Sequence, residues 1–236
     1  MVKPAQPSSI GLRSVRLLQG LSSERLEALA RDCAWRNFDA EQSIISRAAP
    51  DRDLYFIVSG RVRVTTYSAA GRQVTFRDFG PGEHFGEVAA IDGMARSADV
   101  VGLESGLLAS LPPAALARLL REEPALAERL LQDFAKLVRR LSTRVIDLST
   151  LGVHQRLHAE LLRLAREAGV QGNRARIDPA PKHADLASQV STYREQVTRE
   201  LSALARAKVL GKDGRALVVL DVGCLQKMVD EVKSGA

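Results

Sequence analysis

The sequence has little cysteine and few aromatic residues. Only two of its 236 residues are cysteines, Cys33 and Cys224, and tryptophan, tyrosine and phenylalanine together make up 4%. Two distant cysteines are too few for a disulfide framework, a sulfur-rich metal site or the cysteine cluster of an iron–sulfur redox sensor. We therefore exclude these classes and expect a protein of the reducing cytoplasm.

Long hydrophobic runs are also missing. No stretch reaches the roughly 18 apolar residues that a membrane-spanning helix needs. Residues 1–15, MVKPAQPSSIGLRSV, lack the apolar core of a secretory signal peptide. We expect neither export nor a membrane partner.

Arrangements typical of catalysis or metal binding are absent too. No nucleophile–base pair or pair of carboxylates stands out, so we do not expect an enzyme. His84 could be an axial ligand in a haem sensor, but a lone histidine beside a turn is usually an ordinary surface residue. His154 and His158 could share a helix face and hold zinc, but no third ligand is near, so we predict no metal.

The charge of the chain is uneven. The formal net charge is +6, residues 1–124 are balanced, and the basic excess lies beyond them. A basic C-terminal region favours contact with a polyanion such as DNA.

The N-terminal half has the pattern of short strands separated by turns. Glycines recur every eleven residues, at Gly60, Gly71, Gly82 and Gly93. In the alternating segment between the first two, Val62 and Val64 are predicted to face the core. Arg61 and Arg63 are predicted to face solvent. This pattern predicts a β-roll (a double-stranded jelly-roll) with flanking helices over residues 1–123.

Residues 124–151 are predicted to form one long helix, opened by Pro124. Apolar residues recur at spacings of three and four, at Leu126, Leu130, Phe134, Leu137, Leu141, Val145 and Leu148. A heptad-like seam of this length favours a homodimer through a coiled coil. The alternative is a helix that packs on its own β-roll. Gly152 then marks a break or hinge.

Residues 152–236 have the layout of a winged helix-turn-helix. In HADLASQVSTYREQVTRELSALARAKVL, residues 183–210, Val190 and Ser191 are predicted to form the turn. Thr192 is predicted to cap the second helix in a capping box with Glu195. The hairpin around Asp213-Gly214 is predicted to form the wing.

The second helix would present its first turns to the major groove of DNA. Arg194 and Arg199 can bind guanine or phosphate, and Glu195 can accept a hydrogen bond from cytosine. The alternatives are a solvated helix face for the arginines, and a purely capping role for Glu195. Lys212 and Arg215 on the wing are predicted to lie beside phosphates.

The segment GEHFGEVAAIDGMARSADV, residues 82–100, is the candidate effector site. The turn predicted to bind an anion consists of Phe85, Gly86, Glu87, Val88 and Ala89. Arg96 and Ser97 can hold phosphate, and Glu87 can accept a hydrogen bond from a ribose hydroxyl. A cyclic nucleotide carries both groups. The alternative is a salt bridge between Glu87 and Arg96.

These motifs, in this order, resemble the cyclic AMP receptor protein/FNR family of bacterial transcription regulators. The resemblance rests on residues 53–64, 82–98, 124–148 and 183–204. It implies an α+β homodimer with a cyclic-nucleotide-binding β-roll, a dimerisation helix and a winged helix-turn-helix. It further implies a palindromic, TGTGA-like DNA site, contact with RNA polymerase, and cyclic AMP or cyclic GMP as effector.

The resemblance also assigns single residues. Lys182, His183 and Tyr193 match family positions that contact the DNA backbone, and Gln196 replaces a smaller residue of the recognition helix. The purine contacts of the family come from a Thr-Ser pair, which matches Leu141 and Ser142 here, with Thr143 one step on. We therefore expect Ser142 and Thr143 to contact the purine, with cyclic AMP favoured over cyclic GMP. Because some members bind no nucleotide, the alternative is a structural cassette whose protein answers another effector, such as haem, or is constitutive.

Overall fold

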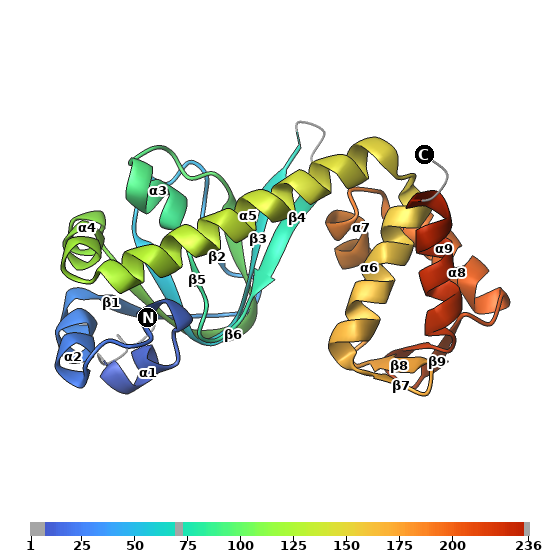
Figure 1. The fold of residues 1–236 in the computed structure, drawn as a ribbon, viewed down its shortest axis with the longest axis horizontal. Helices are drawn as coiled ribbons and strands as arrows, with labels where there is room; N and C mark the ends of the chain where they lie inside the picture. The colour runs from blue at the N-terminus through green and yellow to red at the C-terminus, as the bar shows by residue number, and fades with distance from the viewer. Residues whose placement is uncertain (1–7, 69–72, 234–236) are drawn as a thin grey trace. The chain divides into compact units, whose positions relative to one another are not determined.

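The computed structural model describes residues 8–68 and 73–233. Side chains of the second range are described up to Asp230. The chain divides into an N-terminal unit that ends at Val138 and a C-terminal unit that begins at Arg139, with Gln73 and Val74 grouped with the second unit. The architecture is α+β, as the sequence predicts (Figure 1). No helix in the described ranges is long and apolar enough to cross a membrane.

The N-terminal unit is built on one antiparallel sheet of six strands. Its main strand order is β1-β6-β3-β4, with β2 paired to β6 and β5 paired to β3. The strands are β1 (Ala34–Phe38), β2 (Ser43–Ile45), β3 (Leu54–Tyr67), β4 (Gln73–Phe79), β5 (His84–Phe85) and β6 (Asp99–Leu111). One apolar cluster lies inside the roll, around Ile57, Phe85 and Leu108.

Short helices flank this sheet. They are α1 (Ser9–Arg13), η1 (Arg16–Leu18), α2 (Ser23–Asp32), α3 (Glu87–Asp92) and α4 (Pro113–Glu122). A second apolar cluster joins the helices α1, α2 and α4 to the sheet through residues such as Leu12, Leu29, Phe56 and Leu116. The expected roll with flanking helices is confirmed.

Two details of the predicted strands are wrong. Gly60 lies within β3, not in a turn, and the pairing of β3 with β6 shifts register on both sides of it. A Cβ there would come within 2.7 Å of Gly106 Cα and Ser105 O, so the irregular pairing requires glycine. Arg63 is buried rather than solvent-facing. It pairs with Asp78 through bonds of 2.7 and 2.8 Å, which satisfy its charge. Gly71 lies outside the described residues.

The helix α5 (Pro124–Thr150) starts at the predicted proline. Its first predicted seam residues do not form a free seam, because Leu126 and Leu130 are buried in the core of the N-terminal unit and Phe134 packs against it. The large apolar side chains of α5 that are exposed are Leu131, Val138, Leu141, Val145, Ile146 and Leu148. Apart from Ile146, these residues and Phe134 recur at alternating spacings of three and four, which is the pattern of a heptad repeat. The exposed seam therefore uses Leu131 and Val138 in place of Leu130 and Leu137.

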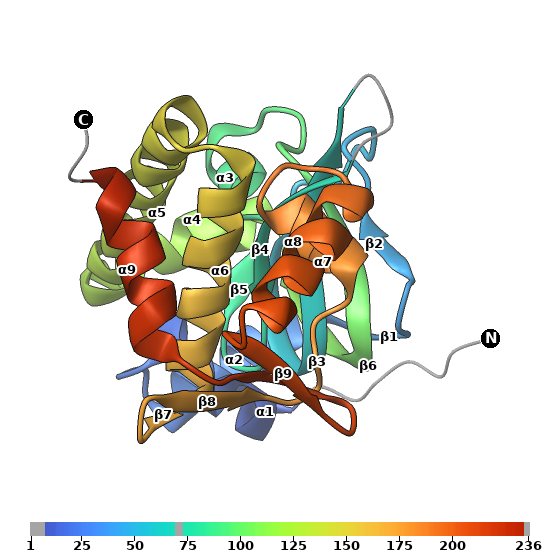
Figure 2. The ribbon, with the colours of Figure 1, turned by 90° about the vertical axis from the view of Figure 1, so that its right-hand side faces the viewer.

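The C-terminal unit packs helices on a small sheet (Figure 2). After the break at Gly152, its elements are α6 (Val153–Ala168), β7 (Val170–Gln171), β8 (Arg174–Ile177), α7 (His183–Gln189), α8 (Arg194–Arg206), β9 (Leu210–Asp213), β10 (Ala216–Val219) and α9 (Val222–Lys233). The sheet order is β7-β8-β10-β9. The wing hairpin β9–β10 is present, with its turn at Gly214-Arg215, one residue later than the predicted Asp213-Gly214. The strands β7 and β8 supply the other half of this sheet.

The predicted capping box of the second helix is wrong. The helix α8 begins at Arg194, and Tyr193 occupies the N-cap position without a side-chain cap. Thr192 is buried and donates its hydroxyl hydrogen to the side-chain oxygen of Gln196. Glu195 therefore closes no capping box and stays exposed.

Candidate effector site and nucleic-acid interface

Arg96 is the centre of the candidate effector site. Arg96 is only 4% exposed, and three acceptors from its own unit bind its guanidinium. Its Nη1 donates to Gly86 O at 3.1 Å, and its Nη2 donates to Asp51 Oδ2 at 2.5 Å and to Asp53 O at 2.9 Å. Its Nε is buried and has no hydrogen-bond partner among the described residues. A buried donor without an acceptor is costly, so an acceptor from a ligand that reached this N–H would remove that cost.

Gly86 lets the chain pass this close to the guanidinium. Its φ is 87°, in the left-handed region that side chains disfavour. A Cβ on Gly86 would lie 2.8 Å from Arg96 Nη1 and 2.9 Å from Asp53 O. Gly86 therefore leaves no room for a side chain between this backbone and the guanidinium.

The Arg96 guanidinium lies over one of two stacked aromatic rings. Tyr55 and Phe85 are stacked with centroids 5.1 Å apart, and the Arg96 guanidinium lies 5.6 Å from the Tyr55 ring centre. The Tyr55 hydroxyl donates to Asp51 Oδ2 at 2.8 Å. Burial alone would raise the pKa of the Asp51 carboxyl, but hydrogen bonds from Arg96 and Tyr55 hold it below its ordinary value. Asp51 is therefore a stable anion beside Arg96.

Of the remaining predicted cassette residues, two have free polar groups. Glu87 is half-buried and Ser97 is exposed, and neither side chain has a hydrogen-bond partner in the described part of the chain. The predicted alternative, an ion pair between Glu87 and Arg96, is wrong because Arg96 pairs with Asp51. Ala89 is buried, as is Phe85, so only their backbone can face a ligand. Val88 is half-buried.

His84 is not the surface residue that the sequence suggests. It lies half-buried in β5. Burial lowers its pKa, although the nearby carboxylates of Glu87 and Asp133 oppose the shift. His84 is therefore a mainly neutral imidazole at pH 7 beside the predicted ribose-binding carboxylate.

Ser142 and Thr143 are exposed on α5 and belong to the C-terminal unit. The Thr143 hydroxyl donates to Arg139 O at 3.1 Å, within the helix. Both side chains are open to solvent and can accept a partner.

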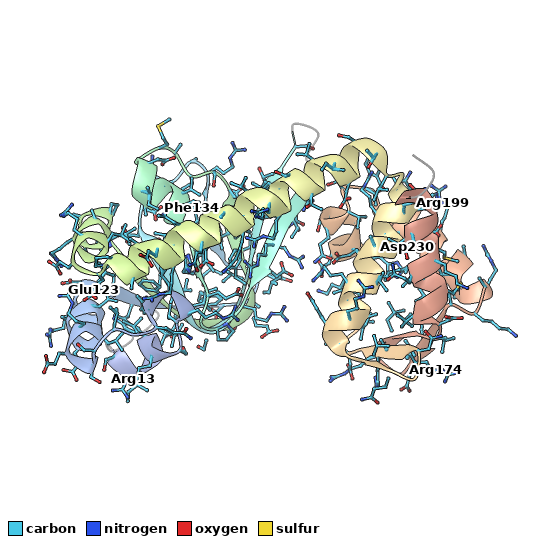
Figure 3. The ribbon with its side chains drawn as sticks, viewed as in Figure 1. Arg13, Glu123, Phe134, Arg174, Arg199 and Asp230 are labelled. Carbon is cyan, nitrogen blue, oxygen red and sulfur yellow. The ribbon has the colours of Figure 1, made fainter. Side chains whose placement is uncertain are left out.

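The start of α8 presents three predicted DNA contacts to solvent. Arg194, Glu195 and Arg199 are all exposed, and Tyr193 just before them is 60% exposed. Arg199 is labelled on this unit in Figure 3. On the opposite side of the helix, Val197 and Leu204 are buried in the core of the unit. Figure 2 shows α8 beside α7, the arrangement of a helix-turn-helix.

Other predicted DNA-binding residues have partners within the protein. The amide oxygen of Gln196 accepts a hydrogen bond from Thr192, so this side chain is partly used for structure. His183 Nδ1 lies 2.8 Å from Thr198 Oγ1, which links α7 to α8.

Of the basic residues beside the helix-turn-helix, Lys182 and the wing residue Lys212 are exposed. Arg215, also on the wing, donates to Asp178 Oδ1 at 2.9 Å but remains 82% exposed.

The two histidines weighed as zinc ligands bind a carboxylate that the sequence pattern did not reveal. Glu200 of α8 lies 2.5 Å from His154 Nδ1 and 2.6 Å from His158 Nε2, on α6. Burial alone would raise the pKa of Glu200, but the hydrogen bonds from His158 and His154 hold it below its ordinary value. No group of three such residues in the described ranges has the arrangement of a metal site. The trio joins the recognition helix to α6.

Profiles of two known domains match the chain. The cyclic nucleotide-binding domain matches residues 35–123, and the Crp-like helix-turn-helix domain matches residues 155–228. The first range holds Arg96 with its surroundings, and the second holds α8 and the wing. These domains define a DNA-binding transcription regulator with a cyclic nucleotide-binding domain.

Known proteins resemble the whole chain. The "Cyclic AMP receptor protein" of Thermus thermophilus is 29% identical, over 90% of this chain and 95% of that protein. The "CRP-like cAMP-activated global transcriptional regulator" of Mycobacterium tuberculosis is 25% identical, over 87% of this chain and 92% of that protein. The solved structure of the c-di-GMP responsive regulator CLP of Xanthomonas campestris has the same fold, with a TM-score of 0.71 at 21% identity, over 84% of this chain and 99% of that one. The chain belongs to the CRP/FNR family of transcription regulators, which is not a family of enzymes.

Proposed function

We propose that this protein is a regulator controlled by a 3′,5′-cyclic nucleotide, cyclic AMP in preference to cyclic GMP. In this proposal it binds a palindromic, TGTGA-like DNA site as a homodimer. The observation that carries the proposal is Arg96, a buried guanidinium with a free Nε beside a glycine that leaves no room for a side chain. A phosphate monoanion supplies the acceptor that this nitrogen lacks.

Other polar groups of the chain suit the rest of a cyclic nucleotide. Glu87, whose carboxylate has no hydrogen-bond partner among the described residues, offers an acceptor to a ribose hydroxyl, and Ser97 offers a hydroxyl to a phosphate oxygen. Ser142 and Thr143, exposed on α5, are the proposed purine contacts. Cyclic AMP is favoured because two relatives that match most of the chain are named for it.

The proposed homodimer forms through residues 124–151. The exposed seam on α5, from Leu131 to Leu148, needs a partner surface, and a second copy of the same helix supplies a matching one. Residues 1–123 would then sense the effector and residues 152–236 would bind DNA.

The DNA interface of the dimer requires two recognition helices about 34 Å apart, one in each successive major groove. We assign base contacts to Arg194, Glu195 and Arg199, because their side chains are exposed at the start of α8. Contacts to the DNA backbone are assigned to Lys182, His183, Tyr193, Lys212 and Arg215, whereas Gln196 is assigned to the base-reading positions of α8. RNA polymerase is the proposed protein partner.

A second candidate function is favoured by one set of contacts. Because Asp51, Gly86 O and Asp53 O already occupy Arg96, the cassette could be purely structural. In that case the protein would bind DNA under another effector, or constitutively. Direct measurement of nucleotide binding separates the two candidates.

Isothermal titration with cyclic AMP and, separately, cyclic GMP tests the proposal. We expect cyclic AMP to bind and Arg96→Leu to abolish binding without unfolding the protein, as monitored by circular dichroism. Arg61→Leu is the matched control, because Arg61 is half exposed and contacts Glu104 only at 3.8 Å. Absence of binding by either nucleotide to the wild-type protein would leave the structural cassette as the function of this segment.

A further inference from the structure

The turn between α7 and α8, residues Gln189–Ser191, is held by two arginines from outside the helix-turn-helix. Arg144 Nη2 donates to Gln189 O at 3.0 Å and to Ser191 Oγ at 3.3 Å. Arg156 Nε donates to Val190 O at 3.0 Å. Each residue of the turn therefore accepts a hydrogen bond from a guanidinium, which is a stronger donor than a neutral group.

The two arginines lie on opposite sides of the helix break at Gly152. Arg144 belongs to α5, and Arg156 belongs to α6. Arg156 also donates through Nη1 to Leu151 O, at 2.7 Å, in the break itself. The end of α5, the break and the start of α6 are thus all connected to one short turn within the C-terminal unit.

The hydrogen bonds of Arg144 are formed at a cost. Burial lowers the pKa of Arg144 and the positive charge of Arg156 lowers it further, against the opposing effect of Glu160. Two guanidiniums near each other repel, so this arrangement does not simply maximise stability. The position of both arginines beside this turn therefore calls for a functional explanation.

The turn that they hold is strained. Ser191 has a φ of 56°, a left-handed conformation that is unfavourable for a non-glycine residue. The turn is completed by Thr192 N, which donates to Ala187 O at 2.9 Å. Because α8 begins three residues after Ser191, a change in this turn alters how the recognition helix is presented.

We propose that Arg144 and Arg156 are positioning residues that transmit the state of α5 to the recognition helix. Arg144 comes directly after Ser142 and Thr143, so a rotation or shift of α5 at these positions moves the guanidinium that holds the turn. This inference rests on the proposed function, because it takes the ligand of α5 to be a cyclic nucleotide. By linkage, the same coupling makes DNA raise or lower nucleotide affinity by an equal factor.

The test measures DNA affinity with and without saturating cyclic AMP. The probe is a labelled duplex that the wild-type protein selects from a random-sequence pool, and binding is monitored by fluorescence anisotropy. For Arg144→Gln and Arg156→Gln, we expect the ratio of the two affinities to fall from the wild-type value toward one. Calorimetry should show that both variants still bind cyclic AMP. Arg139→Gln, which removes one exposed charge from the same helix, should keep the wild-type ratio.

Two outcomes would overturn the inference. If the variants lose thermal stability and DNA affinity equally with and without nucleotide, the arginines are merely structural. If the wild-type protein binds no nucleotide, the proposed function fails, and the contact between Arg144 and the turn is judged by a double-mutant cycle of Arg144→Gln and Ser191→Ala on DNA affinity. Additive effects in that cycle would show that the two residues are not coupled in DNA binding.

Discussion

At the scale of single residues, the main result is that Arg96 and Asp51 form an ion pair where a phosphate is expected to bind. The Arg96 side chain is 2% exposed and that of Asp51 is 36% exposed, so the carboxylate reaches the surface while the guanidinium does not. A ligand phosphate that approaches Arg96 meets a negative charge already in place. We therefore predict that Asp51 lowers the affinity for the proposed nucleotide by competition and by repulsion.

Asp51→Asn is expected to raise cyclic AMP affinity about two- to fivefold, which corresponds to the modest worth of a partly exposed ion pair. Asparagine keeps the acceptor for the Tyr55 hydroxyl and removes the competing charge. Isothermal titration measures the change.

Glu104→Gln is the control for Asp51→Asn, because it removes one carboxylate that is 62% exposed from the same unit. Lower affinity in Asp51→Asn than in the wild-type protein would mean that Asp51 orders Arg96 for the ligand and does not compete with it.

The sequence predicted Arg96, Gly86 and Glu87 as site residues, but it did not predict Asp51 as the partner of Arg96. The reason is distance along the chain: the two residues are 45 positions apart, and pairing of β3 with β5 and β6 brings their segments together. Local motifs report on turns and short helices, whereas a contact of this kind depends on strand register. The contact between Glu200 and His158, 42 positions apart, was also not predictable from a local motif, because it depends on how the helices α8 and α6 are placed in the C-terminal unit.

At the scale of elements, the apolar residues of α5 have two roles. Some pack in the core of their own unit, and others form an exposed seam. Spacing alone assigned Leu126 and Leu130 to a dimer seam, yet these residues are buried in their own unit. A periodicity of three and four is common to both kinds of packing, so only the fold separates them. The boundaries of the helix and its exposed C-terminal seam were nevertheless predictable from Pro124, Gly152 and the repeat.

Val145→Glu is expected to dissociate the proposed dimer. Val145 is 63% exposed in the single chain, so the fold tolerates glutamate, whereas a dimer would bury one unpaired charge from each copy. An uncompensated buried charge costs roughly 3–5 kcal/mol, so the dissociation constant of the dimer should rise at least 100-fold. Sedimentation velocity measures the mass as a function of concentration.

The control for Val145→Glu is Gln132→Glu, an exposed change of equal charge that lies off the seam. If both variants have the same mass as the wild-type protein, α5 does not form the interface.

At the scale of the whole molecule, the two compact units share one continuous helix, because α5 runs from Pro124 through the boundary at Val138 to Thr150. An effector bound in the first unit can act on DNA only if it favours one arrangement of this helix and of the segment that leads into α6. The break at Gly152 is where the direction of the chain can change. The backbone angles and contacts of Gly152 determine which substitution tests this break.

Gly152 is not required by its backbone angles, since its φ of −65° suits any residue. Its N–H donates to Gln155 Oε1, and an added Cβ would lie 3.2 Å from the same oxygen. Alanine is also a poorer N-cap than glycine, so Gly152→Ala should destabilise the start of α6 by about 1 kcal/mol or less. We expect DNA affinity without nucleotide to change by up to about fivefold, as anisotropy measures it.

The comparison that gives this result meaning is Gly80→Ala, where an added methyl group meets no atom within 4 Å. That variant should bind DNA as the wild-type protein does. If Gly152→Ala also leaves ligand-free DNA affinity unchanged while thermal unfolding shows the expected loss of stability, the break caps α6 but does not set the balance between arrangements. Control would then have to pass from α5 to the recognition helix through Arg144 alone, since Arg156 reaches the turn from beyond the break.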